Sequence, residues 1–329
     1  MPDLTVLMSV YNGMPYLPEA IDSVLNQTFG DFVFRIIDDG SEDGSFQYLE
    51  GLRDPRVEVV RQPHCGLGAA LNRGLSLCNT EYLARMDADD LIPSNRLEVQ
   101  MHFLRAHHEV GMVGTQFHYF HDPCHPSSMY ARRLPREHDA IYGDLLEGRL
   151  PLVHASLMMR THLLRRIGGY RVSGIGEDWD MFLRMAEVTR LANVEEVLYS
   201  WRIHPDSVCM RHVAETQLRI AYACACALHR NNGRTEPTYE EFLAGRRGRP
   251  FWERWRDYLD YYGLAQYRGG VGEILTSRWL RGHLRLGWAA LCSPTRACAR
   301  IAKIWRTRGA RRIPKRRAID VQQVPGVPP

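Results

Sequence analysis

Five aspartates in two short groups are the residues of this sequence best suited to chemistry. Asp38 and Asp39 follow one apolar run, and Asp87, Asp89 and Asp90 follow another. The Asp87-x-Asp89 pair offers hard oxygen ligands near one point, which suits Mg²⁺ or Mn²⁺ bound together with substrate phosphates. The same pair in a turn could instead only cap the following helix, so its neighbours must decide between the two interpretations.

The first 90 residues predict a scaffold that would hold these carboxylates. Apolar runs at 5–10, 32–38, 57–60 and 81–87 are typical of buried strands, and segments of helical period lie between them. Repetition at about 30 residues per unit predicts a parallel sheet covered by helices. Ligands bind at the carboxyl ends of such strands, so we expect all five aspartates on one edge. They would repel one another there unless a positive charge lies among them.

Beyond residue 90 the pattern is less regular. We expect further helices and strands there, with a helical region over 206–329 that is rich in Trp and Arg. The helices are expected over 96–107, 138–146, 161–167 and 177–188, and the strands over 111–120 and 156–160.

Tyr11 adds an aromatic ring to the same edge, because it directly follows the first predicted strand. Such a ring offers a stacking face for a nucleobase. A carboxylate and a ring beside a phosphate-bound metal describe a site for a nucleotide diphosphate.

Four separated segments resemble the family 2 glycosyltransferases with the GT-A fold. They are VLMSVYNGMPYLPEAIDSVLNQTFGDFVFRIIDDGSEDGS, EYLARMDADDLIPSNRLEVQ, HASLMMRTHLLRRIGGYRVSGIGEDWDMFLRMA and WRIHPDSV, and they occur in family order between residue 4 and about residue 208. The resemblance implies an α/β fold with a Rossmann-like, mostly parallel sheet flanked by helices and a mainly helical C-terminal extension. It also implies inverting transfer of a sugar from a nucleotide-diphosphate donor such as a UDP- or dTDP-sugar.

The resemblance assigns roles to particular residues. Tyr11 would stack on the nucleobase, Asp39 would accept its ring N–H, and Asp87 and Asp89 would face the diphosphate. The whole nucleotide-sugar site implied in this way comprises Ser9, Tyr11, Asp38, Asp39, Gly66, Asp87, Ala88 and Arg202.

The metal and the catalytic base are implied by the same resemblance. Asp89 would hold Mn²⁺ or Mg²⁺, with Asp87 and His204 as further ligands. Asp178 matches the family's catalytic base, which would deprotonate the acceptor hydroxyl as it attacks, and Glu177 would have a secondary role. Glu177 could alternatively serve only as a favourable charge at the start of a helix.

Two positions depart from the family pattern. Leu71-Asn72 replaces an Arg-Asn pair, so a contact made by that arginine is lost or supplied elsewhere, with Arg73 as the candidate. Trp201 replaces a tyrosine and keeps the aromatic body. The membrane-spanning segments and the Q-x-x-R-W motif of processive synthases are not found, which favours the addition of a single sugar.

Other interpretations fit less well. Residues 66–71 do not open the first βα unit, as a dinucleotide-binding loop would, and the partners of an aspartyl phosphatase are missing. His118, His121, Cys124 and His125 match no standard zinc spacing. Cys224 and Cys226 are expected in core packing. A carbohydrate-binding protein that kept the fold without the chemistry is the alternative from another class.

The charges of the chain are distributed unevenly, with positive charge concentrated near the C-terminus. The chain of 329 residues has a net charge of only +4, yet ten Lys or Arg and no acid lie within 296–317. We expect three regions: the glycosyltransferase domain (1–208), a helical region (209–295), and a basic amphipathic helix with a Pro-containing tail (296–329). That helix is expected to bind an anionic membrane surface, or alternatively to pack on the acidic body.

The family resemblance, the charge and the cysteines also lead to expectations about partners and cellular compartment. The partners expected are a nucleotide sugar and a glycan or lipid-linked acceptor, with no nucleic acid, since the body offers no basic face. Eight cysteines without regular spacing indicate free thiols. With no export signal at the N-terminus, the protein is expected in the cytoplasm, peripheral on the inner face of the membrane.

Overall fold

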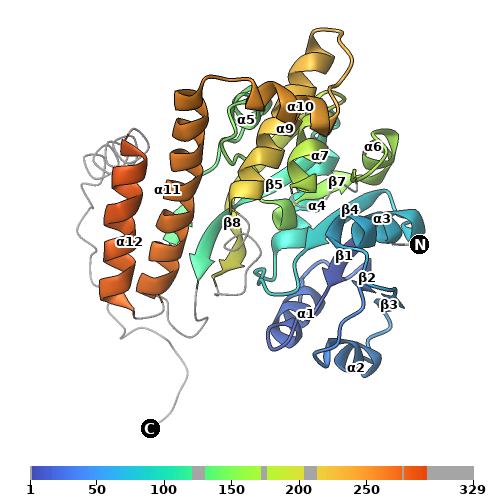
Figure 1. Cartoon of the computed structure of the whole chain (residues 1–329). Coiled ribbons are helices and arrows are strands. Elements are labelled where there is room, and N and C mark those ends of the chain that lie inside the picture. The colour runs from blue at the N-terminus through green and yellow to red at the C-terminus, as the bar shows by residue number, and fades with distance from the viewer. Residues whose placement is uncertain (1, 121–129, 172–175, 204–212, 276–277, 295–329) are drawn as a thin grey trace, which may run out of the picture.

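The structure is a computed structural model that describes residues 2–120, 130–171, 176–203, 213–275 and 278–294 (Figure 1). Within these residues, eight strands form one sheet in the order β3-β2-β1-β4-β7-β5-β6, and β8 pairs with β5. The strands are β1 (Leu4–Val10), β2 (Phe32–Asp38), β3 (Val57–Arg61), β4 (Tyr82–Met86), β5 (Val110–Phe120), β6 (Tyr130–Arg132), β7 (Met158–Arg160) and β8 (Arg190–Arg202).

Strands β1 to β4 are mutually parallel, whereas β7 runs antiparallel to both of its neighbours, β4 and β5. Strand β8 is parallel to β5 and extends the second half of the sheet. The carboxyl ends of β1, β2 and β4 therefore meet at one edge, as the sequence predicts.

Helices cover the two faces of this sheet. In β1, alternate side chains belong to different cores: Val6 and Met8 lie in the core under α1 and α4, and Leu7 lies in the core under α3 and α7. The helices are α1 (Leu17–Leu25), α2 (Ser45–Glu50), α3 (Leu67–Leu77), α4 (Arg96–Ala106), α5 (His138–Leu146), α6 (Thr161–Arg166), α7 (Glu177–Ala186), α9 (Val213–Asn231), α10 (Tyr239–Arg247), α11 (Phe251–Leu275) and α12 (Trp279–Cys292).

The helical region after residue 208 joins the body through α9. Ile220, Ala223 and Ala227 of α9 lie in the same core as α3 and α7. Cys224 and Cys226 are buried on this helix, which confirms their expected role in packing. Helix α11 packs on α9, and α12 packs on α11. No helix in the described part of the chain is long and apolar enough to cross a bilayer.

Two sequence expectations need correction. The strand expected over 156–160 begins only at Met158, because His154–Ser156 forms a single 3₁₀ turn. Strand β8 was not expected at all. Its pairing with β5 shifts register near Gly114 and Gln116, and these irregularities remove the simple alternation that identifies a strand.

Candidate functional site

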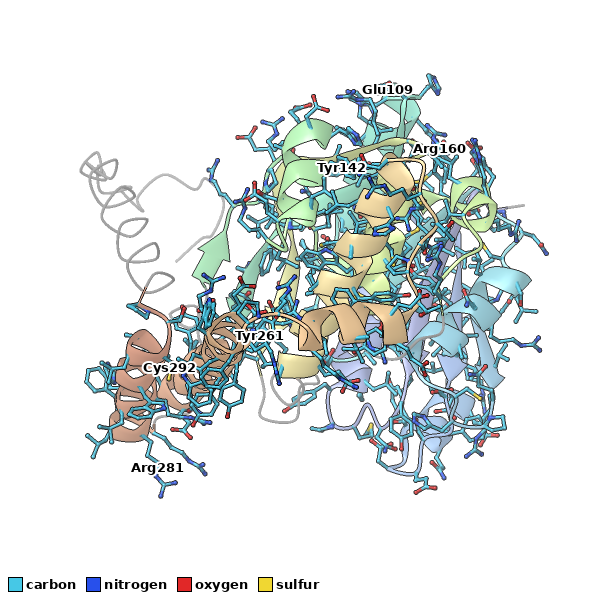
Figure 2. The ribbon with its side chains drawn as sticks, turned by 45° about the horizontal axis from the view of Figure 1, so that its top comes forward. Glu109, Tyr142, Arg160, Tyr261, Arg281 and Cys292 are labelled. Atoms are coloured by element: carbon cyan, nitrogen blue, oxygen red, sulfur yellow. The ribbon has the colours of Figure 1, made fainter. Side chains whose placement is uncertain are left out.

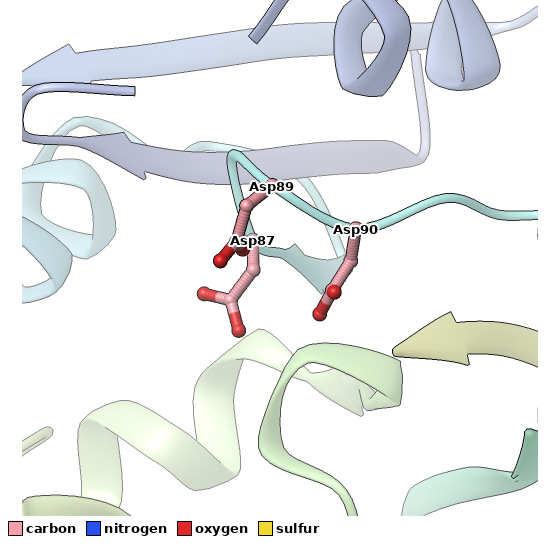
Figure 3. A group of neighbouring side chains, drawn as sticks. All are labelled: Asp87, Asp89 and Asp90. Carbon is pink, nitrogen blue, oxygen red and sulfur yellow. The ribbon is translucent and has the colours of Figure 1, made fainter. Parts of the chain in front are cut away.

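Asp87, Asp89 and Asp90 lie on the loop that follows β4. One carboxylate oxygen from each falls within 4.8 Å of the others. Figure 3 shows Asp87 and Asp89 side by side, with Asp90 slightly farther along the same loop. Such a group of hard oxygen atoms is a candidate site for a divalent cation.

Asp90 differs from the other two because both of its oxygens are engaged by β8. The hydroxyl of Tyr199 donates to Oδ2, and the backbone N–H of Arg202 donates to Oδ1 at 2.6 Å. Asp90 is buried, and burial together with the neighbouring carboxylates raises its pKa well above the usual range. Asp90 therefore fastens the loop to β8.

Tyr199→Phe should lower the free energy of unfolding by about 1–3 kcal/mol, because it leaves an oxygen of the buried Asp90 without its donor. Urea unfolding followed by circular dichroism measures the change. Tyr142→Phe is the matched control, since the Tyr142 hydroxyl accepts an exposed hydrogen bond from Asn231. That control should change stability by less than about 0.5 kcal/mol. Equal losses in both variants would contradict the anchoring role of Asp90.

Arg85 supplies the positive charge that the clustered carboxylates require. It is fully buried, and its guanidinium donates to Oδ1 of Asp87 at 2.6 Å and to the carbonyl of Met86. Burial raises the pKa of Asp87, and the charge of Arg85 opposes that rise. Arg85 and Asp87 are two residues apart, so strand geometry directs both to the same face.

The N-terminus of α7 presents Glu177 and Asp178 to this loop. Burial, with a contribution from Asp178, raises the pKa of Glu177 to about 7. Asp178 is half-buried, accepts the N–H of Trp179 at 2.8 Å, and has its pKa raised by burial and by the charge of Asp87. The two carboxylates thus lie within electrostatic reach of the β4 loop. A carboxylate with a raised pKa is suited to accept a proton near neutral pH.

A half-buried histidine, His154, pairs with the buried Tyr170 close to α3 and α7. His154 Nε2 lies 2.9 Å from the hydroxyl of Tyr170. Burial lowers the pKa of His154 well below its usual value, so this ring is neutral. Asn72 holds the backbone of Tyr170 with two hydrogen bonds, of 2.7 and 2.9 Å. Leu71 is fully buried in the core.

Tyr11 lies at the end of β1, half exposed, and stacks on His64 with a ring separation of 3.9 Å. Asp39, at the end of β2, is buried and holds the loop before α3. Its Oδ1 accepts from the side chain of Gln62 at 2.7 Å and from the N–H of Cys65 at 3.0 Å. Its Oδ2 accepts the N–H of Gly66 at 2.8 Å and lies 2.9 Å from His64 Nδ1.

The structure brings most of the predicted residues to this edge. Ser9 is half-buried near the end of β1, and Ala88 is half-buried within the β4 loop. Asp38 is fully buried, with Oδ2 3.3 Å from Nε of Arg61. His204 lies outside the described residues, as do three of the four residues of the His/Cys group: His121, Cys124 and His125.

The side chain of Arg202 is engaged by other groups of the protein. It donates to the carbonyl of Asp89 at 2.7 Å and to the carboxylate of Glu19 at 2.6 Å. Its guanidinium also packs on the rings of Tyr16 and Phe120, each at 4.6 Å. In this arrangement Arg202 positions the β4 loop from the end of β8.

Sequence reasoning missed Arg85, His64, His154, Tyr170 and Tyr199. Only Arg85 carried a usable signal, because its spacing from Asp87 places both on one side of a strand. The others come from loops or from β8 and meet the site only through the tertiary fold.

Comparison with known proteins decides the family. A model described as Glycosyl transferase family 2 matches residues 5–168. The putative glycosyltransferase EpsE of Bacillus subtilis is 33% identical over 214 residues, which cover 63% of this chain and 75% of that protein. The chain belongs to glycosyltransferase family 2. Asp178 and Arg202 lie beyond the range that the family model matches.

Further relatives of this family 2 glycosyltransferase support the same family assignment. The O-antigen biosynthesis glycosyltransferase WbnJ of Escherichia coli is 28% identical over 212 residues, covering 62% of this chain and 81% of that protein. Staphylococcus aureus TarS 1–349, solved in complex with UDP-GlcNAc, aligns with a TM-score of 0.54 at 18% identity and covers 88% of each chain.

The mannosyltransferase PcManGT of Pyrobaculum calidifontis, solved with GDP-Man and Mn²⁺, aligns with a TM-score of 0.51 at 19% identity. The alignment covers 94% of this chain and 80% of that one. The fold is thus the GT-A fold with a mainly helical C-terminal part, as the sequence resemblance implies.

Proposed function

We propose that this enzyme transfers one sugar, with inversion, from a UDP- or dTDP-sugar to a hydroxyl of a glycan or lipid-linked acceptor in the synthesis of cell-surface polysaccharide. The observation that carries the proposal is the cluster of Asp87, Asp89 and Asp90 at the carboxyl end of β4, with Glu177 and Asp178 of α7 within electrostatic reach of Asp87. A single displacement needs one group that neutralises the leaving diphosphate and one base that receives the acceptor proton.

The donor set of the β4 loop fits Mn²⁺ or Mg²⁺. Asp87 and Asp89 offer carboxylate oxygens, and these cations prefer one or two carboxylates completed by substrate phosphates. We assign the metal to Asp89, assisted by Asp87, with His204 as a further ligand. When bound, the cation would stabilise the negative charge of the departing diphosphate. The Mn²⁺ in the mannosyltransferase structure supports this assignment by analogy of fold.

Asp178 is the proposed base. It is half-buried and its pKa is raised, so it combines access for an acceptor hydroxyl with basicity. Asp180, two residues farther along, is held by Arg184 at 2.7 Å and by Arg171 at 3.4 Å. Both arginines engage the carboxylate of Asp180, which leaves Glu177 as the neighbour best placed to assist.

Tyr11 and Asp39 are proposed to hold the nucleobase. Because each oxygen of Asp39 already has two partners, a ring N–H can bind only if Gln62 or His64 moves away. Both are side chains that can rotate, whereas the other two donors belong to the backbone. Movement of His64 would also expose the ring face of Tyr11 on which it stacks.

The place of action is proposed as the inner face of the cytoplasmic membrane, where a lipid-linked acceptor would lie. The free state of the described cysteines Cys65, Cys78, Cys224, Cys226 and Cys292 fits a reducing compartment. The basic segment 296–329, which the sequence assigns to the membrane, lies outside the described residues.

Nucleotide release tests the proposal. The full chain is incubated with a panel of UDP- and dTDP-sugars, Mn²⁺ and a glycan acceptor, and the free nucleotide is measured. Release that requires the metal and increases with acceptor is expected. Binding of a nucleotide sugar without release under any condition would instead favour a non-catalytic binding protein with the same fold.

The pH profile should report the raised pKa of the base. Only the ionised carboxylate of Asp178 accepts a proton, so kcat/KM should fall as the pH decreases through its pKa. Because burial raises that pKa, the midpoint of the acid limb should lie above about 4, the ordinary value for aspartate. Initial rates at saturating metal measure it. The acid limb should be lost in Asp178→Asn, and an unchanged acid limb in that variant would contradict the role of Asp178.

A further inference from the structure

Helices α11 and α12 form a hairpin at one side of the molecule, with α12 outermost (Figure 1). Small residues line the contact between the two helices. A Cβ atom on Gly282 would lie 2.7 Å from the carbonyl oxygen of Gly270, and one on Gly263 would lie 3.2 Å from that of Ala289. The two backbones therefore approach closely at these points, where Ile274 packs on Gly282 and Leu286 packs on Gly270.

Apart from Leu286, the leucines and tryptophans of α12 point outward. Leu280, Leu284, Trp288 and Leu291 follow one another at helical spacing, and between 53% and 75% of each side chain is exposed. A helix that packs on a protein core directs such residues inward. Here glycine, alanine and Leu286 face the partner helix, and the other three leucines face outward. Helices that pack together in apolar surroundings show this arrangement.

Helix α11 carries a second exposed apolar row. Phe251, Trp255, Tyr258 and Tyr262 lie along one side of it, with successive ring centres between 5.5 and 6.2 Å apart. Tryptophan and tyrosine combine an apolar ring with a polar group, and they concentrate where a bilayer meets water.

The charges beside these rows are positive. Residues 278–294 contain three arginines and no acid. Arg278 and Arg281 are exposed, and Figure 2 shows Arg281 projecting away from the hairpin.

Three of the four acidic side chains of α11 are engaged within the protein, and the fourth, Glu253, lies beside the exposed Arg254 and Arg256. Asp257 pairs with Arg246, and Asp260 accepts from the hydroxyl of Ser293. Glu273 pairs with Arg285 at 3.1 Å. The outward charge of the hairpin therefore complements an anionic partner.

We propose that the α11–α12 hairpin docks on the surface of an anionic phospholipid bilayer. The leucines and Trp288 of α12 enter the interface between headgroups and acyl chains, and Arg278 and Arg281 bind lipid phosphates. A second copy of the chain fits less well, because a symmetric contact through α12 would bring like arginines together. The inference rests on the proposed function only for its purpose, which is to bring the enzyme to a lipid-linked acceptor. Membrane binding itself does not require sugar transfer.

The test compares the full chain with Leu284→Glu/Trp288→Glu on vesicles of 70% phosphatidylcholine and 30% phosphatidylglycerol. Leu228→Glu is the matched control, because Leu228 is a half-exposed leucine of α9, outside the hairpin. In co-sedimentation at low salt, the wild type and the control should bind equally, and the double variant at least tenfold more weakly. Binding should also weaken on pure phosphatidylcholine and in 0.5 M salt.

Two further measurements show whether the substitutions act on membrane binding alone. Thermal unfolding and nucleotide release on a soluble acceptor should be the same in all three proteins, since the substituted residues are exposed and distant from the β4 loop. Equal vesicle binding by the wild type and the double variant would overturn the proposal and place binding elsewhere, including residues 295–329.

Absence of binding by the wild type at low salt would overturn the proposal as well. So would a dimer in sedimentation velocity that the double variant dissociates while vesicle binding stays unchanged. A wild type that binds vesicles but releases no nucleotide from any donor would refute the proposed function and leave this inference intact.

Discussion

Asp89→Asn should nearly abolish sugar transfer, with kcat/KM lower by about 10³-fold or more. The substitution keeps the size of the side chain and removes the negative charge that would hold the divalent cation. Without the cation, the departing diphosphate loses several kcal/mol of stabilisation in the transition state. Nucleotide release at saturating donor and Mn²⁺ measures the loss.

The control for Asp89→Asn is binding of the free nucleoside. Uridine or thymidine carries no phosphate, and Tyr11 and Asp39 are proposed to hold it, so its affinity should be unchanged in ligand-observed NMR. Asp90→Asn is a useful contrast, since Asp90 holds β8, and its substitution should act mainly on stability. Full activity of Asp89→Asn, or of the wild type in excess chelator, would refute the metal-dependent mechanism.

Asp178→Asn should lower kcat by about 10² to 10⁴-fold while the donor still binds. The amide keeps the shape of the carboxylate but cannot accept the proton of the acceptor hydroxyl. Its oxygen can still accept the N–H of Trp179, so the first turn of α7 should be preserved. Steady-state kinetics with a soluble acceptor and donor titration by calorimetry separate the two effects.

Glu177→Gln is the matched variant for this prediction. It removes the neighbouring carboxylate, whose pKa of about 7 also suits proton transfer. We expect a smaller loss than for Asp178→Asn. If Asp178→Asn keeps its kcat and Glu177→Gln loses it, the base is Glu177. Asp180 is a weak candidate in either case, because Arg184 and Arg171 hold its carboxylate.

The sequence predicted the first half of the sheet well because its signals are local. Strands β1 and β2 are continuous apolar runs that the fold buries on both faces. Helices α1 and α3 show apolar residues at helical period, and these residues are the buried ones. Parallel connection then places the strand ends on one edge. The meeting of Tyr11, Asp39 and Asp87 at that edge follows from topology, without knowledge of any side-chain contact.

The roles within the carboxylate group depended on tertiary structure. Asp87, Asp89 and Asp90 look alike in the sequence, and only the arrival of β8 engages both oxygens of Asp90. Strand β8 could not be predicted from the sequence, because its irregular pairing with β5 removes the alternating pattern of apolar residues. Asp39 likewise gains its four partners from a loop more than 20 residues away.

The α11–α12 hairpin likewise has some features that the sequence predicts and others that only the tertiary structure decides. Its composition, rich in Trp, Leu and Arg, was plain from the sequence, and periodicity alone would direct the leucines of α12 into a core. Close contact through Gly270, Gly282 and Ala289 turns Leu280, Leu284 and Leu291 outward instead. Local periodicity determines which residues share a face of a helix, but what that face meets depends on how closely the backbones can approach, and this is a property of the assembled fold.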